Sequence, residues 1–97
     1  MKTIIEKLLS IGGKKVLVPE SLSENILDFA HLYDYKVLIP PGGASRYFLN
    51  HENEVRIIWG FVLTDEEIWV MHSWLIDQRY QVIIDNYCYR EYFGFLK

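Results

Sequence analysis

His72 and Asp85 are the residues of this chain whose types and spacing best suit chemistry. They lie thirteen positions apart, in two apolar segments that are separated by a short polar break at Gln78-Arg79. If these segments pair as antiparallel strands around the break, the two residues stand directly opposite each other. The carboxylate then accepts a hydrogen bond from the imidazole and fixes its tautomer, as in the base-and-orienter half of a catalytic triad. A purely structural hydrogen bond is the alternative interpretation.

The predicted pair depends on the register of the hairpin, which also sets Ile76 opposite Gln81. Successive side chains of a strand point to opposite faces of the sheet. A slip of one residue would therefore place His72 and Asp85 on opposite faces and separate them.

A nucleophile to complete the triad is harder to find. Ser45 follows Gly42-Gly43 at an expected helix start, where it either acts as a nucleophile or caps the helix. Cys88, the single cysteine, lies after the predicted pair. We expect a part-buried and unreactive thiol there, because Arg90 is the only cation close to it in sequence.

The other two histidines do not suggest a metal site. His31 falls on an expected helix without a second ligand one turn away, and His51 falls in a charged turn. We therefore predict no bound metal and no cofactor.

The N-terminal half must supply helices and short strands to support these residues. A capping box at Thr3 and Glu6 begins one expected helix, and a second capping box at Ser21 and Glu24 begins another. The apolar face of the second helix would carry Leu22, Ile26, Phe29, Ala30 and Tyr33. Residues 15–19 and 36–40 read as short strands with nearly the same sequence, Lys-Val-Leu-(Val/Ile)-Pro.

A strand, a helix and a similar strand could form a parallel βαβ crossover unit. The similarity of the two segments has a simpler alternative explanation, which is that β-branched residues commonly precede a proline at the end of a strand.

The C-terminal half changes to β-strands. Residues 44–50 allow a helix of about two turns, and residues 55–63, 67–76 and 80–85 read as strands, with a hairpin loop at 64–66. The tail, residues 86–97, is rich in tyrosine and phenylalanine without a clear period. We predict a single α+β domain over residues 1–97, in which a helical, βαβ-like part packs on an antiparallel meander.

Four short motifs resemble the C-terminal half of the transglutaminase-like branch of the papain-type cysteine-hydrolase superfamily. They are Ile57-Ile58-Trp59-Gly60-Phe61, Trp69-x-x-His72-Ser73-Trp74-Leu75, Val82-Ile83-Ile84-Asp85 and Tyr92-Phe93-Gly94. In that family a strand leading to a glycine precedes a His-(Ala/Ser)-Trp motif, and an aspartate follows on the neighbouring strand. The resemblance implies a minimal papain-like fold in which His72 is the general base and Asp85 orients it.

The sequence departs from this family at the nucleophile. The family places a cysteine at the N-terminus of a helix that precedes the sheet, where the helix dipole and the imidazolium stabilise a thiolate. The best positional counterpart here is Ser45, and a serine hydroxyl is a far weaker nucleophile without strong base assistance. The resemblance therefore favours a pseudoenzyme.

Composition and charge limit the classes of partner that this chain could bind. The net charge of −3 and the scattered basic residues, with Lys14-Lys15 as their only adjacent pair, disfavour nucleic acid and anionic membranes. No apolar run approaches the length of a membrane span, and Glu6 and Lys7 interrupt what would otherwise resemble a signal peptide. A single cysteine suits the reducing cytoplasm.

The aromatic residues leave two open questions. We expect Trp59, Trp69 and Trp74 to lie in the core. The tail residues Tyr87, Tyr89, Tyr92, Phe93 and Phe95 either form a partner-binding patch or fold back on the sheet.

Three functions remain after this reasoning. The first is a non-catalytic binding or inhibitory protein with a protein partner or a second copy of itself. The second is a hydrolase or acyltransferase that uses His72 and Asp85 with Ser45 or Cys88. The third is an unrelated small α+β interaction domain.

Overall fold

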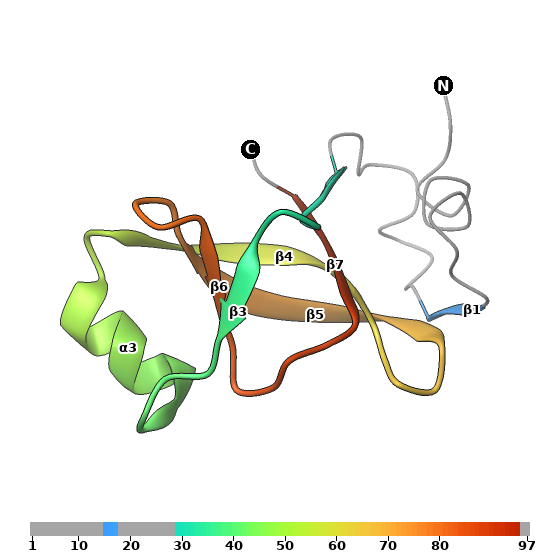
Figure 1. Ribbon diagram of the computed structural model, residues 1–97, viewed down its shortest axis with the longest axis horizontal. Coiled ribbons are helices and arrows are strands. Elements are labelled where there is room, and N and C mark those ends of the chain that lie inside the picture. Colours follow the sequence, from blue (N-terminus) through green and yellow to red (C-terminus); the bar gives the residue numbers. More distant parts are fainter. Residues whose placement is uncertain (1–14, 18–28, 96–97) are drawn as a thin grey trace.

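The computed structural model describes residues 15–17 and 29–95, which form a mixed sheet with one short helix, an α+β arrangement (Figure 1). The described elements are β1 (Lys15–Leu17), β2 (Phe29–His31), β3 (Lys36–Leu38), α3 (Gly43–His51), β4 (Val55–Leu63), β5 (Ile68–Asp77), β6 (Val82–Ile84) and β7 (Glu91–Phe95). The expected helix near Thr3 and the capping box at Ser21 and Glu24 lie outside the described residues.

The C-terminal strands form the predicted antiparallel meander, in which β4 pairs with β5 and β5 pairs with β6. The strand β4 has the predicted bounds, and Thr64 closes the β4–β5 hairpin by accepting backbone hydrogen bonds at its carbonyl and its hydroxyl. The sheet order is β2-β7-β4-β5-β6-β3, with β1 beside the start of β5. This meander is therefore the centre of the sheet.

The aromatic tail folds back on the sheet as the strand β7, between β4 and β2. Tyr92 and Phe93 are buried by this pairing, while Gly94 lies directly beside Gly60 of β4. The sequence showed no period there, because a strand of five residues whose three middle residues are all buried has no alternating polar face.

The second expected helix is wrong over residues 29–33. Phe29 to His31 form β2, and Tyr33 lies in the turn that follows. The helical period of these residues is overridden by pairing with β7, in which Phe29 lies beside Phe95 and His31 beside Phe93. His31 is therefore a strand residue, and its imidazole pairs with the carboxylate of Glu91 on β7.

The expected βαβ crossover is also wrong. The two similar segments do form strands, but β1 pairs in parallel with β5 and β3 pairs in parallel with β6. Each short strand therefore has a partner in the C-terminal meander, which is the ten-residue strand β5 for β1 and the three-residue strand β6 for β3. No ladder joins β1 to β3 among the described strands.

The hairpin between β5 and β6 is shifted by two residues from the predicted register. Ile76 pairs with Ile83 rather than with Gln81. The connection contains four residues, and Gln81 at its end has a positive φ of 52°. A shift of two keeps every side chain on its predicted face, whereas a shift of one would have reversed them.

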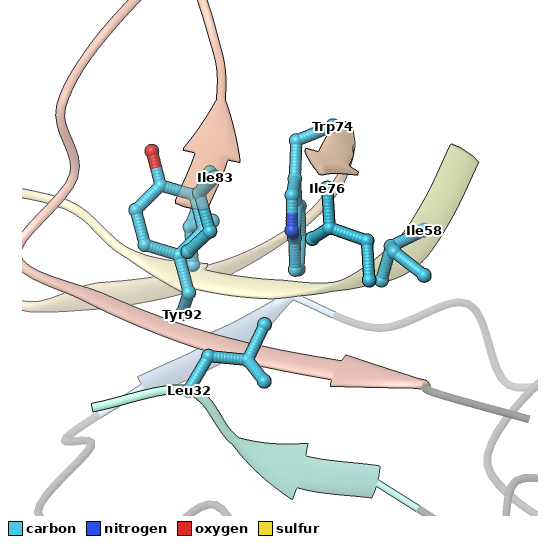
Figure 2. Close-up of a cluster of buried hydrophobic side chains, with 7 residues drawn as sticks. Leu32, Ile58, Trp74, Ile76, Ile83 and Tyr92 are labelled. Carbon is cyan, nitrogen blue, oxygen red and sulfur yellow. The ribbon is translucent and has the colours of Figure 1, made fainter. Parts of the chain in front are cut away.

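The sheet buries apolar side chains on both faces. On one face Trp74 stands among Ile58, Ile76 and Tyr92, with Leu32 packed from the β2–β3 connection (Figure 2). On the other face α3 covers a smaller cluster, made of Val55, Leu75 and Ile84 with the helix residues Ala44, Tyr47 and Phe48. The helix is too short to cover the whole second face, on which Ile57 and Trp59 of β4 remain exposed.

Candidate functional site

The predicted pair forms at the end of β6. The Nε2 atom of His72 lies 2.9 Å from Oδ2 of Asp85, at hydrogen-bonding distance. Asp85 follows β6 directly, and its backbone N–H donates to the carbonyl of Leu38 at 3.2 Å, which extends the pairing of β6 with β3. The His72 side chain is 28% exposed and the Asp85 side chain 7%, so the imidazole lies at the surface and the carboxylate is buried.

Both carboxylate oxygens of Asp85 are occupied. Its Oδ2 also accepts the Tyr92 hydroxyl at 2.9 Å, and its Oδ1 accepts the backbone N–H of Asn86 at 2.7 Å. Burial raises the pKa of Tyr92, and the neighbouring Asp85 charge raises it further, so this phenol stays protonated and remains a donor. The carboxylate of Asp85, at the end of β6, is thus hydrogen-bonded to side chains of both β5 and β7.

Aromatic rings hold the imidazole from two sides. The ring of Tyr89 meets the His72 ring edge-on at a centroid distance of 5.0 Å, and the Trp74 ring lies at 6.0 Å in a stacked orientation. These contacts restrict rotation of the imidazole about its side-chain bonds.

The N-terminus of α3 lies beside this pair. Gly42 and Gly43 both have positive φ, at 81° and 87°, and turn the chain into the helix. The side-chain oxygen of Asn86 accepts the N–H of Ala44 at 2.8 Å and so caps the helix from outside. The alternative interpretation of Ser45 as the cap is therefore wrong, because Ser45 lies inside the first turn and the cap comes from a distant residue.

A surface cavity of about 450 Å³, called the groove below, connects these parts. Ser45, His72 and Asp85 all line it, and Phe48, Leu49 and Ile57 supply apolar walls. It opens beside residues 71–74 of β5, which have no ladder partner among the described strands on the side that β1 and β6 share. The structure thus brings the three predicted catalytic residues to one cavity.

The groove contains no assembled triad. Among the described residues, neither the Ser45 hydroxyl nor the Cys88 thiol forms a hydrogen bond with His72. Cys88 is exposed rather than part-buried, because the segment after Asp85 leaves the sheet and runs along the surface. Its thiol makes only a long contact of 3.9 Å with the carbonyl of Tyr89.

The candidate binding residues of the tail separate into two groups. Tyr92 and Phe93 are buried in the sheet and offer no surface to a partner. Tyr87 is exposed, while Tyr89 and Phe95 are partly exposed.

Sequence reasoning missed a more exposed apolar surface on β4. Trp69 and Trp74 are buried as predicted, but Trp59 is 59% exposed and Ile57 is 58% exposed. Both lie on the face that α3 covers only in part, and Ile57 lines the groove. The signal was present in the sequence, because one helix of about two turns cannot cover two neighbouring strands of nine and ten residues.

Metal and membrane features were searched in the same residues. The part of the chain that the structure describes contains no group of three histidine, cysteine, aspartate or glutamate side chains placed to bind a metal ion. None of the helices in that part is long and apolar enough to cross a membrane.

Comparison with known proteins adds no relative: no family model, no curated protein and no solved structure matches this chain.

Proposed function

We propose that this chain is a small non-catalytic protein that binds or inhibits a protein partner, on a degenerate transglutaminase-like scaffold. The observation that carries the proposal is that both carboxylate oxygens of Asp85 are already engaged in hydrogen bonds within the fold. Its two oxygens serve His72, Tyr92 and Asn86, and no described nucleophile contacts the imidazole. An orienting carboxylate without a nucleophile stabilises structure rather than a reaction.

The scaffold part of this proposal is supported by how the pair is held. The histidine lies on a long strand, the aspartate ends the neighbouring antiparallel strand, and the N-terminus of α3 faces the groove beside both. This is the arrangement that the resemblance implies, with serine where the family has cysteine.

The binding surface that we propose is the groove together with Trp59. Its exposed apolar side chains, Leu49, Ile57 and Trp59, are large. Tryptophan is enriched among the residues that dominate binding energy at protein interfaces, and a concave apolar site can seat a side chain of a partner. A protein partner fits this surface better than nucleic acid, because the chain is acidic overall.

A capture experiment with variants tests the binding proposal. We expect Trp59→Ser to weaken binding of the captured partner by at least about tenfold, as for a central interface tryptophan. Tyr80→Ser is the matched control, since Tyr80 is also an exposed aromatic but lies in the β5–β6 loop away from the groove. His72→Gln, which retains a side-chain N–H at the edge of the groove, should weaken binding much less than Trp59→Ser does.

The decisive measurement is direct binding of the purified partner to each folded variant. Equal binding by the wild type and Trp59→Ser would contradict the proposed surface. A loss of binding in folded His72→Gln as large as that in Trp59→Ser would contradict the assignment of the main binding energy to Trp59. Analytical ultracentrifugation of the wild type and Trp59→Ser shows whether the partner is a second copy of the chain.

A hydrolase or acyltransferase is the second candidate, because Ser45 lines the same groove as His72 and Asp85. This candidate predicts that a fluorophosphonate labels the wild type and that labelling is lost in Ser45→Ala. We expect no labelling of either protein beyond that of denatured chain. Mass spectrometry after incubation gives the labelled residue, and Ser73→Ala is the control, since Ser73 also lines the groove. Stoichiometric label on Ser45 would replace the binding proposal with the enzymatic one.

We also propose a cytoplasmic location. The exposed thiol of Cys88 has no cysteine partner in the chain, and a reducing compartment protects such a thiol from oxidation.

A further inference from the structure

A second cavity, of about 480 Å³, lies between the β4–β5 turn and the segment that joins β6 to β7. Both segments lie on the lower side of β5 in the view of Figure 1. The cavity is lined by Tyr87 and Tyr89 of the β6–β7 segment, by Ile68 and Val70 of β5, and by Asp65 of the turn. This tyrosine cavity shares no lining residue with the groove.

The two tyrosine rings stand at a large angle to each other. Their centroids are 4.9 Å apart and their planes meet at 62°. Tyr89 is braced from behind by the rings of His72 and Tyr92, at 5.0 and 5.9 Å. Tyr87 is held from the other side, where its hydroxyl donates to Oδ2 of Asp65 at 2.7 Å. The cavity therefore has a preformed aromatic wall with two differently oriented rings.

The rim of this cavity is acidic. Asp65 and Glu66 both line it, and Glu66 forms no ion pair among the described residues. Arg90 lies in the same region, but its guanidinium faces Glu67 at 3.7 Å, so these two charges offset each other. The hydrogen bond to Asp65 raises the pKa of Tyr87, which keeps its ring neutral with this carboxylate beside it.

We propose that the tyrosine cavity binds the side-chain ammonium group of a lysine from a partner protein. Aromatic faces attract cations, and a carboxylate rim adds a favourable charge without neutralising the rings. Ile68 and Val70 supply an apolar lining for the four-carbon stem of the lysine. A carboxylate ligand would be repelled by Asp65 and Glu66, and a purely apolar ligand would leave their charges unused. This site is independent of the groove, so it stands or fails separately from the proposed function.

Titration with N-acetyl-lysine methylamide, followed by the NMR signals of the chain, tests this proposal without an identified partner. We expect saturable shifts at Tyr87, Tyr89 and Val70, at up to about 10 mM ligand, the weak end of the affinity scale. The neutral analogue with norleucine in place of lysine should bind at least about fivefold more weakly, since it lacks the cation–π attraction. Trimethylation of the ammonium should tighten binding, because the methylated cation loses less hydration.

Variants separate the contribution of the aromatic ring to lysine binding from that of the carboxylate charge. We expect Tyr87→Ala to weaken binding about three- to tenfold, and Tyr87→Phe, which keeps the ring, to weaken it by less than about twofold. Glu66→Gln should weaken binding about two- to fivefold, and the loss should shrink in high salt. Tyr80→Ala and Glu52→Gln are the matched controls, since both residues are exposed and line neither cavity.

Three outcomes would overturn the proposal. The first is the absence of shifts at the tyrosine cavity over the full titration. The second is equal binding of the lysine and norleucine probes, which would show an apolar pocket rather than a cation site. The third is a loss in Tyr87→Ala that Tyr80→Ala matches, which would show a general effect of removing a surface tyrosine.

Discussion

Gly60→Ala is expected to cost more than about 3 kcal/mol of the free energy of unfolding, above the usual range for overpacking. A Cβ atom on Gly60 would lie 2.2 Å from the carbonyl oxygen of Phe93 and 2.7 Å from the ring of Trp74. The first of these atoms belongs to the backbone of the neighbouring strand and cannot move without breaking the β4–β7 ladder. Small domains have only about 5–15 kcal/mol of stability, so this change removes a large share.

Urea unfolding followed by tryptophan fluorescence measures the effect, with Ser73→Ala on β5 as a control expected to change stability by less than about 0.5 kcal/mol. Gly94→Ala provides a sharper comparison. A Cβ atom on Gly94 would meet only side chains, with Ile58 and Trp74 at 2.9 Å and Leu32 at 3.2 Å. Trimming Trp74 to leucine should therefore recover part of the loss in Gly94→Ala but little of the loss in Gly60→Ala. A cost below about 1 kcal/mol for Gly60→Ala would contradict the close approach of β4 and β7.

Asp77→Ala is expected to cost about 2–4 kcal/mol, because it removes a buried carboxylate that four hydrogen bonds satisfy. Arg79 donates to both oxygens through its side chain and once through its backbone N–H, and the Tyr47 hydroxyl donates to Oδ2 at 2.8 Å. Asp77 is the last residue of β5 and is fully buried, so it ties α3 and the β5–β6 loop to the sheet. Tyr47→Phe, which removes one of the donors, should cost about 1 kcal/mol.

The same carboxylate predicts a pH dependence. The hydrogen bonds from Arg79, and then that from Tyr47, hold the pKa of Asp77 at about 2, below its usual value of 3.8. A depressed pKa in the folded state stabilises the protein above the unfolded pKa. We therefore expect this stability to be complete above about pH 5 and to be lost as the pH falls from about 4 through about 2.

Unfolding curves of the wild type and Asp77→Asn between pH 2 and pH 6 isolate this contribution from that of the other carboxylates. The difference in stability between them should be largest near pH 6 and should shrink towards pH 2. A constant difference for Asp77→Asn would mean that the carboxylate titrates alike in the folded and unfolded chain.

Elements with strong local patterns were predictable from the sequence. The strand β4 has the predicted bounds because all of its residues except Arg56 and Gly60 are apolar or β-branched, and polar turn residues follow Leu63. The β5–β6 register was wrong because its loop is closed by the contact of Arg79 with Asp77 and by a positive φ at Gln81. Neither feature follows from propensity, since both depend on how the loop folds against the sheet.

The strands β2 and β7 could not be predicted, because each is stabilised mainly by a partner that lies far away in the chain. Phe29–His31 carries a helical period, and Glu91–Phe95 carries no period, yet all of β2 pairs with residues 93–95 of β7. Pairing of this kind depends on the finished sheet and not on either segment alone.

The contact between His72 and Asp85 was predictable from the sequence, whereas the other hydrogen bonds of the site were not. His72 and Asp85 meet despite the wrong register, because a shift of two residues preserves the face and leaves the pair in diagonal reach. The acceptor role of Asn86 at the helix N-terminus and the donor role of Tyr92 were missed. Both contacts join the segment after β6 to elements that have no fixed position relative to it in the sequence.

The place of β7 between β4 and β2 sets an order in time for folding. The β4–β5 hairpin joins neighbouring segments and can form as soon as residue 77 is available. The sheet cannot be completed until residue 95 has been synthesised, because β2 has only β7 as its ladder partner among the described strands. During synthesis, therefore, β2 has no ladder partner until about 60 further residues have been added. This takes on the order of several seconds at typical elongation rates. This interval is when the chain is most exposed to aggregation, and when a chaperone that shields strand edges would help it most.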